Sequence, residues 1–556
     1  MRFFTTLFLI SFPLFFISAQ PPASAQMDVG RLRISISQDG NLGSDDVPFL
    51  SYRLEDGTFV SLLQKGGLQF GGLDPTGNVV VANFDGTTNR PGLADFQGFL
   101  PGVFRVTKNQ VETHIADFAD NLMIDDTISA IFGWPGLGNS LFETYAEISL
   151  PLTYQNLADF WDANTDGVYN PDVGDTPHFF TRPFVEVCAP EKVPTEMFWV
   201  AFSQRSTDLS PVTFQINHFL TIASFGCPDA DPGSLENRSF VIHYKTIYQE
   251  EESTIDTHFG LNMLSALGDP GNDALGTDPE SNLAYFYSTT ETDDAFGEEA
   301  VPMVGIFPLK GPLYPDASPT SLQNILPIYK YENGPVAFGP AADAAQFYNT
   351  LQGHWRDGSS LTFGGNGFES GEPTNFAFPG TPGNPEEWTF AAVDELPNGV
   401  GASINYEAIE LLPGAVNEHT FVVVVTSEGT TAAERLASLR GDFEQLAPHI
   451  TGTPFCSIYT DCSTLPSSIV TTEASFLSFR VYPNPINNDG QLLLDFGQDK
   501  SPDLQQLLVV DMLGRQLAVD WSNGKGVDVG QLPVGAYTIL AQTVNGDWYR
   551  SRFVKR

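Results

Sequence analysis

Apolar and polar residues alternate over short stretches in the first third of the chain. Residues 31–37, Arg-Leu-Arg-Ile-Ser-Ile-Ser, alternate strictly, as a strand with one solvated face should. Residues 66–72 and 79–82 have strand character, and the turn sequence Asp-Pro-Thr-Gly at 74–77 lies between them. The pattern therefore predicts a β domain over residues 26–152.

The middle of the chain carries the strongest strand signals. Its β-branched and aromatic runs, separated by polar turns, are typical of an antiparallel sandwich. These runs are residues 198–202, 212–222, 240–248, 258–264 and 421–426. Residues 341–351 and 432–446 have helical spacing instead, and we expect both helices to pack on the β scaffold. The sequence thus predicts a central β-sandwich region with acidic loops over residues 153–462.

Composition indicates an ordered chain that is rich in turns. Hydrophobic residues make up 42% of the 556 residues, 44 Phe and 17 Tyr supply core material, and 51 Gly with 40 Pro favour turns. A chain of this length exceeds a single hydrophobic core, so roughly two to four domains are expected. We predict an all-β fold of multidomain β-sandwiches with a few short helices.

The chain is strongly acidic, with 26 Lys and Arg against 68 Asp and Glu and a formal net charge of −42. Nucleic acid is excluded as a partner class, because phosphate binding needs a basic stripe and the sequence has none. Self-repulsion that keeps the protein soluble explains most of these acids. Divalent cation binding is the alternative for a few of them.

The N-terminus has the pattern of a secretory signal peptide. Arg2 precedes a largely apolar, uncharged stretch over residues 3–19. Ala23-Ser24-Ala25 offers small residues for cleavage, so residues 1–25 are the expected leader and Gln26 the expected mature start. A membrane anchor is the alternative, although about 17 residues are marginal for spanning a bilayer. No other segment is long and apolar enough, so we expect no transmembrane anchor in the mature chain.

Four cysteines remain in the expected mature chain: Cys188, Cys227, Cys456 and Cys462. An exported chain meets an oxidising compartment, where disulfides are the default state. The short spacing of Cys456 and Cys462 suits one loop-closing disulfide, which leaves Cys188 to pair with Cys227. Free thiols are the alternative. A zinc site is disfavoured, because no C-x-x-C or nearby pair of histidines is present.

The best local candidate for a binding site is the segment Asp-x-Asn-x-Asp-Gly at residues 162–167. Oxygen donors at alternate positions followed by Gly match the first half of an EF-hand-type calcium loop. Val173 takes the place of the usual bidentate Glu, so Asp172 or Asp175 would have to complete the shell. The predicted Ca²⁺ ligands are Asp162, Asn164, Asp166, Val168, Asn170, Asp172 and Asp175. An Asx-rich turn without metal is the alternative.

The sequence indicates no set of catalytic residues. The nucleophile motif G-x-S-x-G and the zinc motif H-E-x-x-H are absent. His218 and His243 lie inside predicted strands, where packing is the simpler explanation. His354 beside Trp355 is a tempting pair, yet packing under a Gly-rich turn explains it equally well. The acidic stretch 268–273 is best read as a structured loop.

The last part of the chain is predicted to be a separate module. Residues 463–475 are rich in Ser, Thr and Pro and form the expected linker. Residues 476–556 contain several strand runs with turn signals between them, including Asn545-Gly546. Unaided, this pattern predicts an immunoglobulin-like β-sandwich of roughly seven strands.

The same module resembles the type A sorting domain of Bacteroidetes type IX secretion cargo. The resemblance rests on the VYPNP opening, the VVDMLGRQ and LPVGAYTI segments and the terminal Phe-Val-Lys-Arg. Its matching positions include Tyr482, Pro483, Asn484, Pro485, Gly514, Gly535, Tyr537 and Lys555. The resemblance implies recognition by the outer-membrane translocon, followed by removal of the domain and by surface attachment or release. A plain carbohydrate-binding or adhesive sandwich is the alternative.

The main body is also similar to large exported Bacteroidetes proteins that carry this sorting domain, through GGLQFGGLDPTGNVVVA, the segment that begins at Asp162, and the segments LQGHWRDG and TFGGNG. That family has no activity we can transfer. We therefore expect a secreted or cell-surface β protein with a structural, adhesive or ligand-binding role, and a glycan or a surface protein as ligand. The alternatives are a secreted hydrolase acting on polysaccharide or protein, and an architectural surface-layer component.

Overall fold

The fold is described from a computed structural model of the chain. For the main body it describes residues 20–82, 89–91, 100–150, 157–179, 193–205, 215–226, 233–312, 321–329, 336–338, 341–393 and 397–451. In the C-terminal module it describes residues 477–478, 480–483, 486, 490–496, 504–511, 516–517, 519–522, 526–532, 535–544 and 548–555. Statements about the structure refer to these residues.

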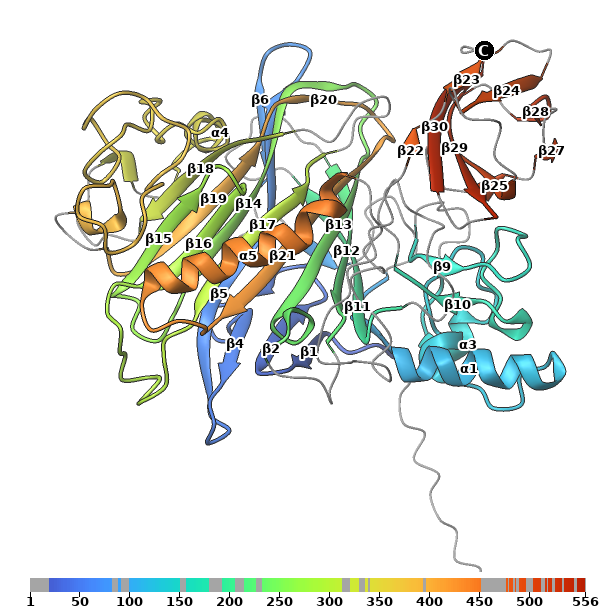
Figure 1. The fold of residues 1–556 in the computed structure, drawn as a ribbon, viewed down its shortest axis with the longest axis horizontal. Helices are drawn as coiled ribbons and strands as arrows, with labels where there is room; N and C mark the ends of the chain where they lie inside the picture. The colour runs from blue at the N-terminus through green and yellow to red at the C-terminus, as the bar shows by residue number, and fades with distance from the viewer. Residues whose placement is uncertain are drawn as a thin grey trace, which may run out of the picture.

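Two large sheets, sheet I and sheet II, lie face to face in the main body (Figure 1). Sheet I contains β1 (Ser24–Val29), β2 (Leu32–Ser37), β3 (Leu42–Gly43), β4 (Leu50–Arg53), β5 (Phe59–Leu73), β6 (Val79–Ala82), β14 (Thr254–Ser265), β18 (Leu322–Tyr329), β19 (Val400–Tyr406) and β20 (Ile409–Leu411). Sheet II contains β7 (Asn89–Pro91), β8 (Phe104–Thr107), β11 (Glu196–Arg205), β12 (Gln215–Ser224), β13 (Ser239–Tyr248), β15 (Asp273–Asp278), β16 (Leu283–Ser288), β17 (Met303–Lys310) and β21 (Val416–Thr426). The all-β class is confirmed.

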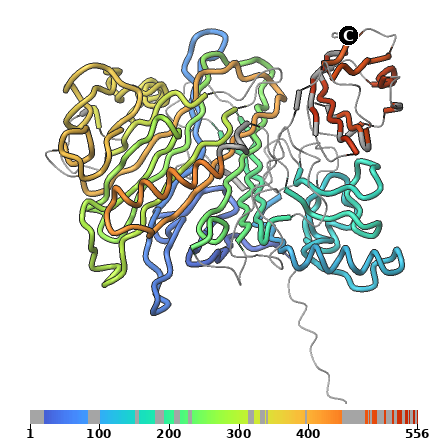
Figure 2. The backbone as a smooth tube through the Cα atoms, viewed as in Figure 1, coloured from blue at the N-terminus to red at the C-terminus, as the bar shows by residue number. Residues whose placement is uncertain are grey.

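The predicted N-terminal and central regions share one sandwich. Strand β5 pairs antiparallel with β14, for example Phe70 with Phe259, although these strands are far apart in sequence. Figure 2 shows the early strands, in blue, lying among later strands of the same body. Residues before and after the boundary predicted at residue 152 therefore share one hydrophobic core. Strand β5 also begins earlier than the predicted segment 66–72 and runs through Gly66 and Gly67, because β14 supplies pairing partners on both sides of these glycines.

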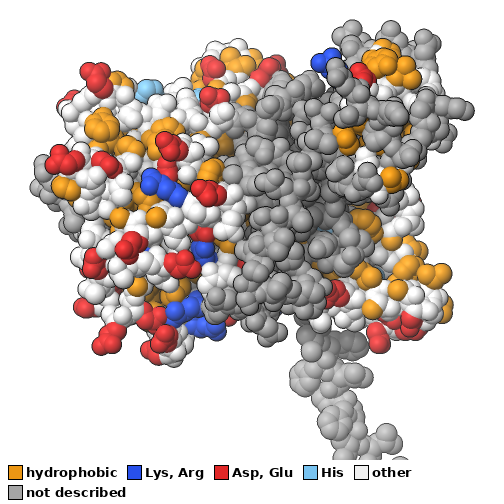
Figure 3. Space-filling model, viewed as in Figure 1, with side chains coloured by type: hydrophobic (Ala, Val, Ile, Leu, Met, Phe, Trp, Pro, Cys, Tyr) orange, Lys and Arg blue, Asp and Glu red, His pale blue; other side chains and the backbone are white. Residues whose placement is uncertain are grey.

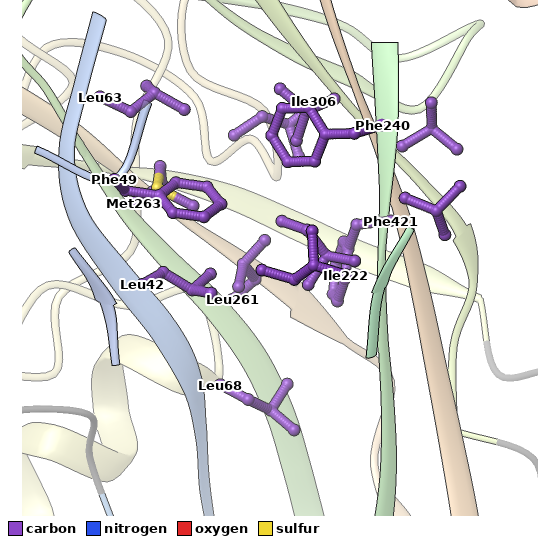
Figure 4. Close-up of a cluster of buried hydrophobic side chains, with 14 of the residues drawn as sticks. Leu42, Phe49, Leu63, Leu68, Ile222, Phe240, Leu261, Met263, Ile306 and Phe421 are labelled. Carbon is purple, nitrogen blue, oxygen red and sulfur yellow. The ribbon is translucent and has the colours of Figure 1, made fainter. Parts of the chain in front are cut away.

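The core fills the space between the two sheets. Alternate residues of β14, including Leu261 and Met263, point toward Phe240 of β13 and Phe421 of β21 (Figure 4). These side chains are fully buried, and each contributes about 1.5–3 kcal/mol relative to an exposed position. The period of two in the strand sequences therefore selects which face of each strand meets the other sheet.

Two helices cover the outer faces of the sheets, as the sequence predicts. Helix α5 (Ala432–Thr451) crosses the outer face of sheet II (Figure 1), where Phe443 stacks on Phe307 at 5.8 Å between ring centroids. Helix α4 (Ala344–Leu351) packs on sheet I, and its Leu351 approaches Gly71 and Gly260 closely. A Cβ at Gly71 would lie 2.9 Å from a Leu351 methyl group, and a Cβ at Gly260 would lie 2.1 Å from Asn405 Oδ1 and 3.1 Å from Leu351.

A helical lobe interrupts the region predicted as an N-terminal β domain. It contains α1 (Lys108–Asn121), α2 (Ser129–Phe132) and α3 (Phe142–Ala146). Thr107 and Gln110 form a capping box at the start of α1, with the Gln110 backbone N–H donating to Thr107 Oγ1. This Thr-x-x-Gln signature is present in the sequence, but the surrounding charges hide the amphipathic spacing. Only Val111 and His114 of α1 are buried.

The C-terminal module has its own two sheets and its own core. One sheet contains β22 (Leu477–Ser478), β25 (Leu504–Asp511), β26 (Gln516–Leu517), β29 (Gly535–Thr543) and β30 (Trp548–Lys555). The other contains β23 (Arg480–Tyr482), β24 (Gln491–Asp495), β27 (Asp520–Ser522) and β28 (Gly526–Asp528). Val481, Leu492, Val509, Ile539 and Phe553 are among its buried residues. The predicted two-sheet sandwich is confirmed, with more described strands than the seven expected.

Histidines lie inside the apolar core of the main body. His419 is fully buried between the rings of Phe259, at 4.5 Å, and Tyr406, at 6.0 Å. Neither ring nitrogen of His419 has a hydrogen-bond partner among the described residues. Burial lowers the pKa of His419 well below its ordinary 6.5, with the charges of His218 and His243 acting in the same direction. Burial alone lowers the pKa of His218 to about 3.

We predict that replacing His419→Leu makes the main body more resistant to acid. Below pH 6.5 the unfolded chain takes up a proton at this residue and the folded chain does not, so stability present above 6.5 is lost as pH falls. Relative to the variant, the wild type should lose about 2 kcal/mol between about pH 7.5 and about pH 5. Denaturant unfolding at the two pH values measures this difference.

The matched control is Phe259→Leu, which removes the ring against His419 but no titrating group. It should lower stability by a similar amount at both pH values. Equal pH dependence in the wild type and His419→Leu would contradict the buried neutral imidazole.

Candidate functional site

The predicted calcium loop closes a short hairpin on the helical lobe. Strands β9 (Phe160–Trp161) and β10 (Thr176–Pro177) pair antiparallel, with Trp161 opposite Thr176. The loop from Asp162 to Asp175 therefore begins and ends at adjacent points. This brings Asp175 to the start of the loop, although thirteen positions separate it from Asp162 in sequence.

The first half of the loop is held by its own side chains. Asp162 accepts hydrogen bonds from the backbone N–H of Asp166, at 3.3 Å, and of Gly167, at 2.7 Å. Asn164 Oδ1 also accepts from the Asp166 N–H, at 3.1 Å, and Asp166 Oδ1 accepts from the N–H of Val168 at 2.8 Å. Gly167 has φ +77°, which suits glycine at the sharp turn. Three of the predicted ligands thus lie around one turn.

Asp175 lies inside the loop and joins its two ends. Its Oδ1 accepts from the Ala163 N–H and its Oδ2 from the Asn170 N–H, both at 2.8 Å. The residue has no exposed surface. Burial is the main cause that raises the pKa of Asp175 to about 6; the charges of Asp162 and Asp166 act in the same direction, and the two N–H donors oppose them.

Asn170 and Asp172 lie at the 3₁₀ turn in the second half of the loop. Asn170 Oδ1 accepts from the Asp172 N–H at 3.1 Å and caps the 3₁₀ turn Pro171–Val173. Asp172 is exposed. Of the two acids weighed for completing the shell, Asp175 is therefore the one that the fold places within the loop. Val168 is 41% exposed, and the ligand predicted at this position is its backbone carbonyl.

The lobe anchors the loop through buried aromatic and imidazole groups. Tyr169 is 1% exposed, and its hydroxyl donates to the Ile131 carbonyl at 2.8 Å. The Nε2 of His114 on α1 donates to the Pro171 carbonyl at 3.0 Å, and burial lowers the pKa of His114. Phe118, one turn further along α1, leaves room only for a glycine at 174. The loop geometry therefore depends on α1.

A second acidic cluster, which sequence reasoning missed, lies at the end of α1. Ligand-type oxygens of Asp117, Asp120 and Asp125 lie within 4.8 Å of one another, the one such trio of His, Cys, Asp or Glu in the described part of the chain. Asp117 Oδ2 accepts from the N–H groups of Asp125 and Asp126. The chain reverses at Leu122, which has φ 63°, and this reversal brings the acids together. The i, i+3 spacing of Asp117 and Asp120 was the available signal.

The hairpin residues dock on the outer face of sheet II. Asp159, just before β9, accepts from Lys245 Nζ of β13 at 2.5 Å. The ring of Phe179, just after β10, meets His243 of β13 edge-on at 5.7 Å between centroids. Lys245 lies opposite the buried Glu418 of β21 in the antiparallel pairing of the two strands. The hairpin that carries the loop therefore rests on a charged patch of the sheet.

The other residues singled out in the sequence have structural positions. His218 and His243 are buried in β12 and β13. Trp355 is buried, with its Nε1 donating to the Gly367 carbonyl at 3.0 Å, which places it under the Gly-rich turn beside His354. The stretch 268–273 is a structured loop: buried Asp273 accepts from Ser265 Oγ at 2.7 Å, and burial raises its pKa to about 7.

The predicted disulfides and part of the predicted sorting signal lie outside the described residues. These are Cys188, Cys227, Cys456, Cys462, Asn484, Pro485 and Gly514. Tyr482 is 49% exposed, and Tyr537 is buried and stacks on Phe553 at 5.3 Å. Gly535 pairs with Lys555 across β29 and β30.

Lys555 is buried near the end of the last strand. Its Nζ donates to the carbonyls of Val529 at 2.9 Å, Gly530 at 2.7 Å and Leu532 at 2.5 Å. All three ammonium protons thus have acceptors in one turn of the chain. Lys555 therefore ties β30 to the segment after β28.

Comparison with known proteins assigns no family. No protein-family model matches the chain. No curated protein matches it. A solved structure titled polysaccharide lyase aligns with 64% of this chain and 35% of its own chain, at 8% sequence identity and a TM-score of 0.19. A likeness at that TM-score carries no argument about function. Within the described residues, no helix has the length and apolarity to cross a membrane.

We predict that Asp175→Ala loosens the hairpin in cation-free buffer. The substitution leaves the N–H groups of Ala163 and Asn170 without their acceptor, which should lower stability by about 1–2 kcal/mol. Hydrogen exchange across β9 and β10, together with urea unfolding in EDTA, measures the effect. Asp172→Ala is the control, because that side chain is exposed and should change stability by less than about 0.5 kcal/mol. Equal effects would show that Asp175 does not join the loop ends.

We predict that Lys555→Ala destabilises the C-terminal module. Three carbonyls, two of them on buried residues, lose a charged donor, and the loss should be about 3 kcal/mol. The unfolding transition of this module, followed calorimetrically in the full chain, should move to lower temperature. Ser551→Ala on the same strand is the control and should leave that transition nearly in place. An unchanged transition in Lys555→Ala would contradict the anchoring role.

Proposed function

We propose that this protein is exported to the cell surface or medium, and that its main body binds a ligand in a calcium-dependent manner at hairpin β9–β10. The single observation that carries the proposal is the position of Asp175. Asp175 is buried in the same loop as Asp162 and Asp166, near enough for the charges of these two acids to raise its pKa. Calcium prefers several oxygen ligands in such loops. A bound Ca²⁺ would offset the mutual repulsion of the three acids.

Trp161 supports the ligand-binding part of the proposal. In the described main body, Trp134, Trp199, Trp355 and Trp388 are buried. Trp161 is half-buried and lies directly before Asp162 on β9. Its ring contacts His178 at 6.2 Å between centroids, and the part that stays exposed combines apolar surface with a polar edge, which suits binding surfaces. We therefore place the contact surface beside the calcium loop, with a glycan as the first ligand class and a surface protein as the second.

Export is the second part of the proposal, and it rests on the resemblance of the C-terminal module to type IX sorting domains. That module has a hydrophobic core of its own and an exposed Tyr482 at its opening motif. We propose that the outer-membrane translocon recognises this module. Acidic side chains spread over the visible face of the main body (Figure 3), which suits a protein that stays dispersed outside the cell.

We predict that Ca²⁺ stabilises the full chain and is required for ligand binding. Binding to the folded state alone raises unfolding stability by about 2.7 kcal/mol at one hundred times the dissociation constant. Calorimetry with Ca²⁺ should show heat for the wild type, and Asp162→Ala should abolish it. A screen of glycans and surface proteins, with Ca²⁺ or with EDTA, should show binding only with Ca²⁺.

Trp161→Ala separates the two parts of this prediction. It should lose ligand binding and keep the Ca²⁺ heat, whereas the exposed Phe363→Ala should keep both. No heat and no change in melting with EDTA would exclude the calcium loop. Turnover of a polysaccharide or protein in the same screen would favour the hydrolase alternative. No binding in either condition would favour an architectural role.

A further inference from the structure

Residues 20–25 are part of the folded main body. The Pro22 carbonyl accepts from the Val103 N–H at 2.8 Å, and the Ala23 carbonyl accepts from the Gln38 N–H at 2.8 Å. Strand β1 begins at Ser24, which pairs with Ser37 of β2. The segment therefore supplies backbone acceptors to two different parts of the body.

Side chains of the same segment also pack on the body. Ala25 contacts the main core and pairs with Ile36. Pro21 lies against Gly102, where a Cβ would come within 2.5 Å of the proline ring. Gly102 has φ +117°, which itself requires glycine. Pro21 can therefore approach the backbone closely, because Gly102 has no side chain there.

The segment also forms one wall of a cavity. Gln20, Pro21, Pro22, Ser24 and Ala25 line a cavity of about 400 Å³. Phe104, Arg105 and Tyr145 are among the other residues that line it. Cleavage after Ala25, at the small-residue site predicted from the sequence, would remove this wall. It would also remove the first two pairs of the β1–β2 ladder and the acceptors for Val103 and Gln38.

We infer that the signal peptide is cleaved between Ala19 and Gln20, so that the mature protein begins at Gln20. The inference rests on the proposed export. The step is hydrolysis of one peptide bond, in which water adds to leave a carboxylate on Ala19 and an amino group on Gln20. Ser18 and Ala19 are small residues at the end of the apolar stretch 3–19, with Ile17 at the first position of the A-x-A pattern. Residues 20–25 then stay with the fold that uses them.

Mass spectrometry of the N-terminal peptide tests the inference on the full chain, expressed with its own leader in a secreting host. The expected mature terminus is Gln20, either free or cyclised to pyroglutamate. A terminus at Gln26 would overturn the inference and leave export intact. A chain that keeps Met1 through Ala19 would contradict export as well. Any other terminus would also overturn the inference.

Two matched variants locate the site independently. A charged residue beside the scissile bond should block processing, so Ala19→Asp should accumulate the uncleaved precursor. Ala23→Asp disrupts only the downstream small-residue site, at an exposed position, and should be processed as the wild type is. The reverse result would place cleavage after Ala25.

A stability measurement keeps the structural argument testable by itself. Chains that begin at Gln20 and at Gln26 are compared by thermal unfolding of the main body. The chain from Gln26 should unfold at a lower temperature and exchange the Val103 and Gln38 amides faster. Equal unfolding temperatures and equal exchange would overturn the inference, because residues 20–25 would then contribute nothing to the fold.

Discussion

The burial of both faces of the central strands is the constraint on which the rest of the structure depends. In an ordinary sandwich each strand has one face in the core and one face in water. Here every residue of β21 is buried, and so is nearly every residue of β13. The outer faces therefore need their own cover, which α5, α4 and the helical lobe provide. Any polar side chain on those faces must find its partner inside the protein.

The hydrogen bonds of the outer faces follow from that constraint. On sheet I, Gln69 and Asn262 exchange amide hydrogen bonds at 2.7 Å in both directions. On sheet II, Lys245 needs an acceptor, and Asp159 brings one from the hairpin. The hairpin is thus fixed to the body by a group that the sheet cannot leave unpaired. The position of the acidic loop therefore depends on this contact and on α1, rather than on its own short strands.

The sequence predicts those parts of the fold whose signals are local. The β-branched run at 421–426 and the helical spacing at 432–446 both correspond to observed elements, because period and propensity act within a few residues. Helix α1 was missed because its buried face is too narrow to show as a pattern. The sequence named Asp175 as one of two acids that could complete the loop, but it did not select between them. The pairing of β9 with β10 brings Asp175 near Asp162, and no local sequence pattern reports that pairing. The trio at the end of α1 likewise depends on a chain reversal at a leucine.

The electrostatics of the loop are decided by its immediate neighbours and not by the net charge of the whole chain. Charges in solvent are screened over about 8–10 Å at physiological salt, so most of the excess acids act weakly on Asp175. Asp162 and Asp166 lie in the same loop, and burial reduces the screening between them and Asp175. Two backbone N–H groups oppose this repulsion, yet the pKa still rises to about 6. The N–H groups hold the carboxylate in place without neutralising it. With a pKa of about 6, the Asp175 carboxylate is mostly ionised near neutral pH, so the loop carries its negative charge there.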